Sequence, residues 1–220
     1  VNMDTFAIVV DYQNGHYNFV GMSGNEYPEP TEIGDGAHSL TMPTDVLLGG
    51  ITRSIFATAD DELRPVMNGV YFDICTEYVT FVASDGHKLV RYRNYQTRGE
   101  ESASFILPKK PALLIKNILP KADGEAYVRF DDRNAVVEAG EFKVSCRLIE
   151  GRYPNYNSVI PAGNPYRVTV DRQALISALR RVSVFASVSS ALIKLHIDGS
   201  TLTVSAQDID FSTSAEERLM

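Results

Sequence analysis

The sequence predicts an α+β fold in which a strand, a helix and a run of antiparallel strands form a half-unit that recurs along the chain. A short strand running directly into a helix is predicted three times, at residues 39–48, 105–114 and 166–176. β-rich runs separated by turn residues accompany these segments. A pattern that recurs with a period of about 65 residues indicates repeated copies of one structural unit. Two such half-units would form a domain of about 130 residues.

Four antiparallel hairpins are predicted, because β-rich runs flank short turn segments. The first joins residues 7–12 to residues 16–20 through Gln13-Asn14-Gly15, and Asn-Gly between β-rich runs is a strong hairpin signal. The other three are expected at residues 70–83, 127–138 and 192–205.

Amphipathic helices are predicted from apolar spacing. Leu47, Ile51 and Ile55 fall at i, i+4 and i+8, which places one apolar face against a sheet. We expect helices near residues 44–58 and 109–119, on the same side of the sheets of one domain. Gly49-Gly50 lies within the first helix pattern, which favours close helix packing over phosphate binding.

Two connectors, at residues 21–37 and 162–164, divide the chain. The first holds Pro28 and Pro30 among several glycines. We expect residues 1–36 to be the C-terminal part of one domain, residues 37–162 to be a complete domain, and residues 163–220 to be the N-terminal half of a third. A chain that begins and ends within a repeat is expected to be a fragment.

Charge is unevenly distributed. The 220 residues carry a formal net charge of −7, with 44% hydrophobic residues and no apolar run of membrane-spanning length. The three helix windows, residues 42–59, 108–121 and 171–186, carry eight basic and two acidic residues, a net charge of +6, so the remainder carries −13. Local potential, rather than net charge, attracts phosphate, and a repeated basic face is therefore compatible with nucleic-acid binding.

Residues that could carry chemistry are sparse. Cys75 and Cys146 lack metal-ligand spacing and are expected to be free, buried thiols of a reducing compartment. The four histidines show no metal-binding spacing, and we expect no cofactor. One alternative is a hydrolase that uses Asp85 and His87 with Cys75 or Ser84 as nucleophile. Another alternative is a repeat-built protein-interaction scaffold without DNA binding.

Three motifs point to a known family. They are Leu63-Arg64-Pro65-Val66-Met67-Asn68-Gly69, Ser84-Asp85-Gly86-His87-Lys88-Leu89 and Glu150-Gly151-Arg152-Tyr153-Pro154-Asn155-Tyr156. In this order and at this separation they resemble the bacterial DNA polymerase III beta subunit, the sliding clamp. That family has T-D-G-H-[RK]-L and D-G-R-[FY]-P-[DN]-Y signatures, and Ser84 keeps the hydroxyl of the usual Thr. The resemblance runs from the end of the first clamp domain to the middle of the third.

The resemblance implies the DNA clamp fold, with helices on the inner face of a ring and sheets outside. Family members are head-to-tail homodimers that encircle double-stranded DNA without reading its sequence, as processivity factors of chromosomal replication. The chain is thus expected to be a cytoplasmic, non-catalytic accessory subunit. The side chains expected to face DNA are Arg53, Lys109, Lys110, Lys116, Arg172, Arg180 and Arg181.

The resemblance also implies an apolar cleft between the second and third domains that binds short peptides of the replicative polymerase, the clamp loader and repair polymerases. These peptides carry a glutamine and two or three bulky apolar residues. Part of the cleft wall would come from the end of the third domain. Matched residue by residue, the cleft here would comprise Arg64, Met67, Ser84, Gly86, His87, Lys88, Leu89, Pro154, Ser158 and Val159. Ser158 takes a place that is often basic in relatives.

Overall fold

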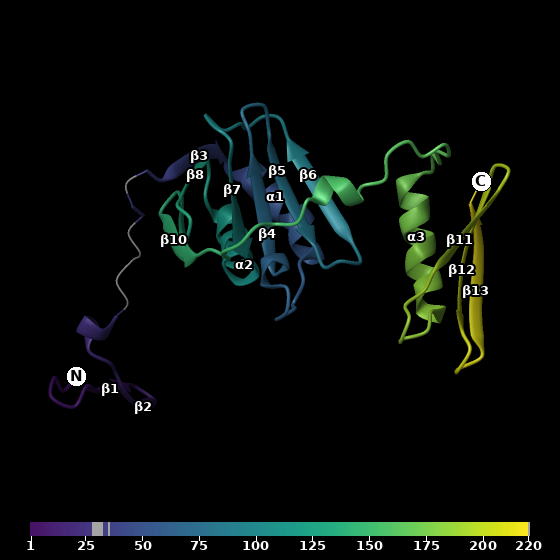
Figure 1. Cartoon of the computed structure of the whole chain (residues 1–220). Helices are drawn as coiled ribbons and strands as arrows, with labels where there is room; N and C mark the ends of the chain where they lie inside the picture. Colours follow the sequence, from purple (N-terminus) through teal and green to yellow (C-terminus); the bar gives the residue numbers. More distant parts are fainter. Residues whose placement is uncertain (28–32, 35, 220) are drawn as a thin grey trace. The chain divides into compact units, whose positions relative to one another are not determined.

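The computed structural model describes residues 1–27, 33–34 and 36–219. The chain divides into two compact units, residues 1–160 and 161–220. Figure 1 traces both. Because residues 1–36 fall within the first unit by this division, the domain boundary at residue 36 stays a prediction. Pro28 and Pro30 of the expected connector lie outside the described residues.

The N-terminal hairpin forms as predicted. Strand β1 (Ala7–Tyr12) pairs antiparallel with β2 (Gly15–Val20), and Tyr12 lies opposite Gly15, so the turn consists of Gln13 and Asn14 alone. A single 3₁₀ turn, η1 (Gly24–Glu26), follows.

Two four-stranded antiparallel sheets form the centre of the first unit. One has the order β10-β9-β8-β3, and its strands are β3 (His38–Pro43), β8 (Glu125–Phe130), β9 (Asn134–Ala139) and β10 (Phe142–Arg147). The other has the order β6-β5-β4-β7, and its strands are β4 (Gly69–Ile74), β5 (Val79–Ser84), β6 (Leu89–Asn94) and β7 (Ala103–Pro108). The predicted hairpins β4–β5 and β8–β9 are both present.

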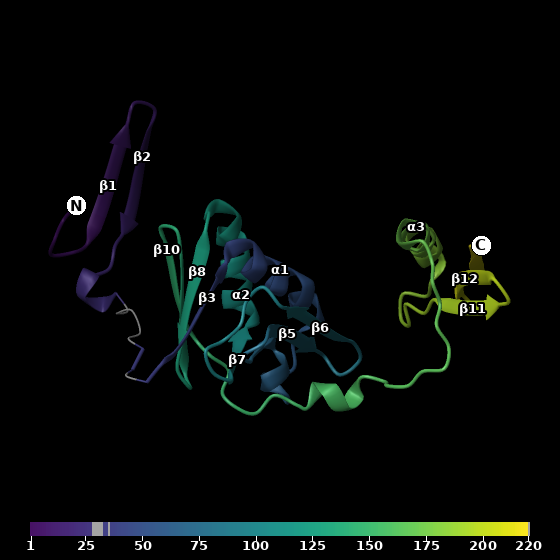
Figure 2. The same cartoon turned by 90° about the horizontal axis from the view of Figure 1, so that it is seen from above.

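Two helices follow the first strand of each half-unit, as predicted. Helix α1 (Thr44–Ser54) continues into the 3₁₀ turn η2 (Ile55–Ala57), and α2 (Lys109–Ile118) continues into η4 (Leu119–Lys121). Each helix contacts strands of both sheets, and the two helices contact each other. Figure 2 shows them together on one side of the β4–β7 sheet, while the segment after β10 runs along its other side. The expectation that both helices lie on the same side is confirmed.

Strand β5 is buried at all six positions because both of its faces are covered. Phe81 packs on the helix side, where its ring occupies the space that a side chain on Gly50 of α1 would need. Val82 packs on the other side with Tyr153 and Tyr156. The predicted role of Gly50 in close packing is therefore confirmed.

The remaining short elements of the first unit are 3₁₀ turns, η3 (Pro65–Met67) and η5 (Tyr156–Val159). The second unit contains α3 (Arg172–Val182), η6 (Ser183–Phe185) and the sheet β11-β12-β13, whose strands are β11 (Lys194–Asp198), β12 (Thr201–Asp208) and β13 (Thr213–Leu219). Helix α3 packs Ala178 and Val182 against Val204 of β12.

The strand predicted at residues 166–170 is wrong, since these exposed residues form no ladder. In the first unit the corresponding strands β3 and β7 pair with β8 and β4, which belong to other hairpins. Within the described part of the second unit, all three strands already pair with one another. Residues 166–170 pair with neither β11 nor β13, the two edge strands of that sheet, so this segment forms no strand.

Candidate functional site

The Ser84–Leu89 motif forms the turn between β5 and β6. The Ser84 hydroxyl donates to the Lys88 carbonyl at 2.8 Å and accepts from the Gly86 N–H at 3.1 Å. The Asp85 carboxylate accepts from the N–H groups of His87 and Lys88, each at 2.9 Å, and pairs with the Lys88 ammonium. Lys88 and these backbone donors hold the pKa of Asp85 well below its usual range. The hydroxyl of Ser84 thus closes the turn, and the Thr usual at this place in the family would supply the same group.

Gly86 has a φ of 91°, a left-handed conformation that favours glycine. A Cβ at this position would also lie 2.7 Å from Nη1 of Arg64, whose Nη2 is 3.4 Å from the Asp85 carbonyl oxygen. Glycine at position 86 is consequently favoured by its backbone conformation, and the end of the Arg64 side chain lies close above it. The predicted proximity of Arg64 to the turn is present.

An apolar cluster covers the face of the β4–β7 sheet that points away from helices α1 and α2, here called its outer face. We call it the outer cluster; it contains buried Val82, Ile106, Tyr153 and Tyr156, flanked by half-buried Val66, Tyr71, Leu89, Ile149 and Ile160. The rings of Tyr71 and Tyr153 stack with their centroids 4.6 Å apart and their planes nearly parallel. The segment after β10 therefore docks on the sheet through aromatic side chains.

The structure brings some of the predicted cleft residues together and separates others. Leu89 joins the outer cluster, whereas Met67 is buried and offers almost no surface. Pro154 and Val159 are exposed on the segment that crosses the sheet, with Val159 67% exposed. Lys88, His87 and Ser158 are exposed as well. Sequence reasoning did not assign Val66, Tyr71 and Tyr153 to the cleft, although they belong to the same cluster as Leu89. They come from η3, from β4 and from the segment after β10, so only the tertiary fold brings them together.

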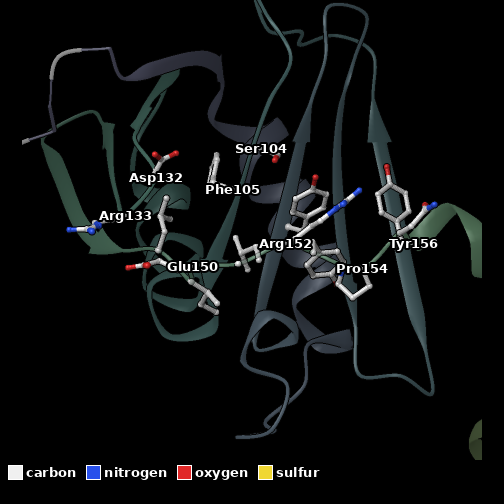
Figure 3. Close-up of a pocket in the computed structure, with 15 residues that line it drawn as sticks. Ser104, Phe105, Asp132, Arg133, Glu150, Arg152, Pro154 and Tyr156 are labelled. Carbon is white, nitrogen blue, oxygen red and sulfur yellow. The ribbon is translucent and has the colours of Figure 1, made fainter.

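A pocket of about 720 Å³ lies along the same segment, as Figure 3 shows. Asp132 and Arg133 line one end, and Arg152, Pro154 and Tyr156 line the other. Of the predicted cleft residues, only Pro154 lines this pocket. Its charged side chains are of both signs, so it presents no single electrostatic preference.

Some of the predicted DNA-facing side chains already have a partner within the protein, and others do not. Lys109 is half-buried and its Nζ pairs with Asp60 at 2.5 Å, and Arg181 pairs with Glu217 through two contacts of 2.6 and 2.7 Å. The Arg53 guanidinium lies over the Tyr92 ring, 4.9 Å from its centroid. Among the described residues, the other four make no ion pair: Lys110, Lys116, Arg172 and Arg180.

The helix surfaces also carry apolar side chains. Phe56 after α1 is 63% exposed, and Leu113 and Leu114 of α2 are exposed beside Lys110. The helix face of the first unit is therefore less positive than the count of basic residues in the helix windows suggested, because Lys109 is paired with Asp60 and apolar side chains occupy part of the surface. Lys109 itself is only partly exposed, and its ammonium is already paired with Asp60.

Three of the residues named for the alternative hydrolase function, Cys75, Ser84 and Asp85, make hydrogen bonds within turns. Ser84 and Asp85 are occupied as described above, and Cys75 Sγ lies 3.2 Å from the Tyr78 carbonyl. Both cysteines are free but half-buried rather than buried. Burial raises the pKa of Cys146 to about 11. In the part of the chain that the structure describes, no cluster of side chains has the composition of a metal site, and no helix is long and apolar enough to cross a membrane.

A two-sheet domain with paired helices on one side, built from repeated half-units, is the architecture of a DNA sliding clamp. Residues 41–155 match the family described as the DNA polymerase III beta subunit, central domain. This match spans just over half of the chain, which therefore belongs to the bacterial DNA polymerase III beta subunit family, the beta sliding clamps.

Individual relatives agree with this assignment. The beta sliding clamp of Synechococcus elongatus is 27% identical over 92% of this chain and 56% of its own length. That of Pseudomonas aeruginosa is 24% identical over 99% of this chain and 59% of its own length. The crystal structure of the Thermotoga maritima DNA polymerase III beta subunit matches with a TM-score of 0.85 and 27% identity, over 97% of this chain and 58% of that one. A Pseudomonas aeruginosa clamp bound to griselimycin matches with a TM-score of 0.86 and 25% identity, over the same shares. The chain thus spans less than two thirds of the relatives it matches.

Proposed function

We propose that this chain is part of a ring-shaped sliding clamp that encircles duplex DNA and acts as a processivity factor of chromosomal replication. Family membership carries the proposal, and the position of α1 and α2 on one side of the sheets supports it. In the complete protein, a head-to-tail homodimer would close the ring. The role is that of a cytoplasmic, non-catalytic accessory subunit, with no cofactor.

Sequence-independent phosphate contacts would let the ring move along DNA. Lys110 and Lys116 make no ion pair among the described residues and lie on the helix that follows β7. Lysine attracts phosphate without reading bases, and such contacts weaken strongly as salt rises. The exposed apolar side chains nearby limit the number of these contacts. Weak, nonspecific attraction together with enclosure suits a sliding protein better than tight binding does.

Partners would be tethered by a short peptide motif with a glutamine and bulky apolar residues. We assign the peptide cleft to Leu89, Pro154 and Val159 beside the Gly86 turn, with Arg64, Ser84, His87, Lys88, Met67 and Ser158 around them. Apolar side chains rimmed by polar groups are typical of partner sites. That a relative binds griselimycin supports a ligand site in this fold. The replicative polymerase, the clamp loader and repair polymerases are the proposed partners.

Charge reversal tests the DNA role. Lys110→Glu with Lys116→Glu should reduce retention on nicked circular DNA after loading by the clamp loader. Arg129→Glu with Arg147→Glu is the matched control, because both arginines lie between residues that pack against the core, and so face away from it, and neither makes an ion pair among the described residues. Linearising the circle should release the wild-type protein. Tight binding to one short linear sequence would contradict binding by enclosure, and equal retention of all variants would show that Lys110 and Lys116 do not contribute. Failure of the wild type to be retained on the circle would favour the scaffold alternative.

Peptide titration tests the cleft. A fluorescent peptide with a glutamine and a Leu-Phe end should bind with roughly micromolar affinity, about −8 kcal/mol. Val159→Asp should weaken binding at least about tenfold, since a charge would enter an apolar site. Val188→Asp is the control, because Val188 is 93% exposed in the second unit. Unchanged affinity for Val159→Asp would show that the cleft lies elsewhere.

A further inference from the structure

The loop before β4 is fastened by the side-chain amide of Asn68. Its Nδ2 donates to the Asp61 carbonyl, and its Oδ1 accepts from the Asp61 N–H, both at 2.9 Å. The backbone carbonyl of Asn68 accepts from the N–H of Lys109 at 3.1 Å, which ties this point to the start of α2. One amide thus satisfies both backbone groups of Asp61 and fixes where that residue sits.

Asp61 in turn fixes Arg64. One carboxylate oxygen accepts from the Leu63 N–H at 2.8 Å, and the other accepts from Nε of Arg64 at 2.8 Å. The Arg64 guanidinium accordingly holds the pKa of Asp61 below its usual value. The Asp61 side chain is 27% exposed and that of Arg64 is 50% exposed, so the pair lies at the surface with part of the guanidinium open to solvent.

The guanidinium lies directly over the β5–β6 turn. Its Nη2 reaches the Asp85 carbonyl oxygen at 3.4 Å, and its Nη1 occupies the space that a Cβ on residue 86 would fill. Nε is used by Asp61 and one Nη2 donor by Asp85. Because arginine has five N–H donors in a planar fork, the remaining donors are available to an acceptor on a bound molecule.

We propose that Asp61 and Asn68 are positioning residues of the partner-peptide cleft, holding the Arg64 guanidinium over the Gly86 turn so that it forms the polar edge of the cleft. This inference rests on the proposed function, and it adds a recognition chemistry: a carbonyl or carboxylate oxygen of the peptide accepts from Arg64. Fixing a long side chain before binding removes an ordering cost from the binding step. Without Asp61, Arg64 would have to be ordered by the peptide itself.

Asp61→Asn is the informative variant, because Asn keeps an acceptor for the Leu63 N–H but offers an NH₂ group toward Nε of Arg64. Glu62→Gln is the matched control, since it removes the same charge from the adjacent, exposed residue. Asp61→Asn should weaken binding of the fluorescent Gln/Leu-Phe peptide between about two- and fivefold, the range of a partly exposed ion pair. Glu62→Gln should leave the affinity unchanged. Equal affinities for the two variants would overturn the proposal.

A double-mutant cycle separates positioning from a general structural role. In an Arg64→Ala background, Asp61→Asn should have no further effect on peptide affinity, because its effect passes through Arg64. A loss of the same size in both backgrounds would overturn the proposal.

The hydrogen bond itself can be followed without peptide. By ¹⁵N NMR, the Arg64 Nε–H should exchange slowly in the wild type and in Glu62→Gln, and rapidly in Asp61→Asn. Slow exchange in Asp61→Asn would show that Asp61 does not hold Arg64. If the wild type bound no peptide, the proposed cleft would fall, whereas this exchange measurement would still decide whether Asp61 holds Arg64.

Discussion

The hydroxyl of Tyr156 donates a hydrogen bond of 2.5 Å to the carboxylate of Asp73, which lies 83 residues earlier on β4. Tyr156 begins the 3₁₀ turn η5, so this bond fastens the segment that bears Pro154 and Val159 to the outer face of the sheet. The ring of Tyr156 also packs edge-on against Tyr71. A polar contact and an aromatic contact thereby fix the course of the chain over this sheet, within the first unit.

Tyr156→Phe should lower the free energy of unfolding by about 1–3 kcal/mol, because it removes a hydrogen bond to a charged acceptor and leaves the half-buried Asp73 without its donor. Tyr127→Phe is the control, since Tyr127 is exposed and its hydroxyl is 3.4 Å from Glu125. Urea denaturation followed by circular dichroism measures both. Equal stability of the two variants would mean that the Asp73 contact contributes nothing.

Alkaline pH should destabilise the first unit. Burial raises the pKa of Tyr153 and of Tyr156 to about 12, from the ordinary value near 10. Above pH 10 the unfolded chain releases these protons before the folded chain does, so the stability present below pH 10 is lost as pH rises toward 12. Cys146 adds to the loss from about pH 9, because its raised pKa acts in the same direction.

Tyr153→Phe isolates the tyrosine contribution. Among the described residues, the buried Tyr153 hydroxyl has no hydrogen-bond partner, so its removal should leave the stability at pH 8 unchanged or slightly higher. The decline in stability between pH 10 and 11, measured by urea denaturation, should be shallower in the variant. An identical decline in both proteins would mean that Tyr153 ionises freely in the folded state.

Cys146 should react slowly with alkylating agents. A pKa of about 11 instead of 9.0 lowers its thiolate fraction at pH 8 by about 100-fold, and the thiolate is the reactive form. In a Cys75→Ser variant, mass spectrometry should show slow modification of the folded protein and rapid modification in urea. Fast modification of the folded protein would contradict the burial that raises the pKa of this thiol.

Gly50→Ala should destabilise the first unit by roughly 1–3 kcal/mol, because the new methyl group would overlap the Phe81 ring in a close-packed core. Gly49→Ala is the matched control on the same helix. There the methyl group would meet only the flexible end of Arg53, and alanine is a better helix former by about 1 kcal/mol. Thermal unfolding should therefore rank Gly49→Ala at or above the wild type and Gly50→Ala clearly below it. The reverse order would contradict the packing of α1 on β5.

Local sequence patterns predicted the structural elements whose formation depends on residues close together in the chain. The hairpin at β1–β2, the helices α1 and α2 and the Gly86 turn each follow from side-chain spacing or turn chemistry within about ten residues. The same holds for Ser84, since both of its turn hydrogen bonds are made within four residues. The motif set likewise indicated the family, because signatures with a fixed order and spacing are features of the sequence itself.

Tertiary structure alone decided which distant residues meet. Asp60 neutralises Lys109, Tyr156 binds Asp73, and Arg64 lies over Gly86, all across separations of more than 20 residues. The unpaired chain at residues 166–170 shows the same limit, since a β-rich segment becomes a strand only where another strand offers its backbone hydrogen bonds. Sequence thus determined the elements and the family of this protein. Tertiary packing decided the geometry of the candidate cleft, and it decided which basic side chains of the helix face are paired. The reason is that hydrogen bonds, ion pairs and burial depend on distances in space.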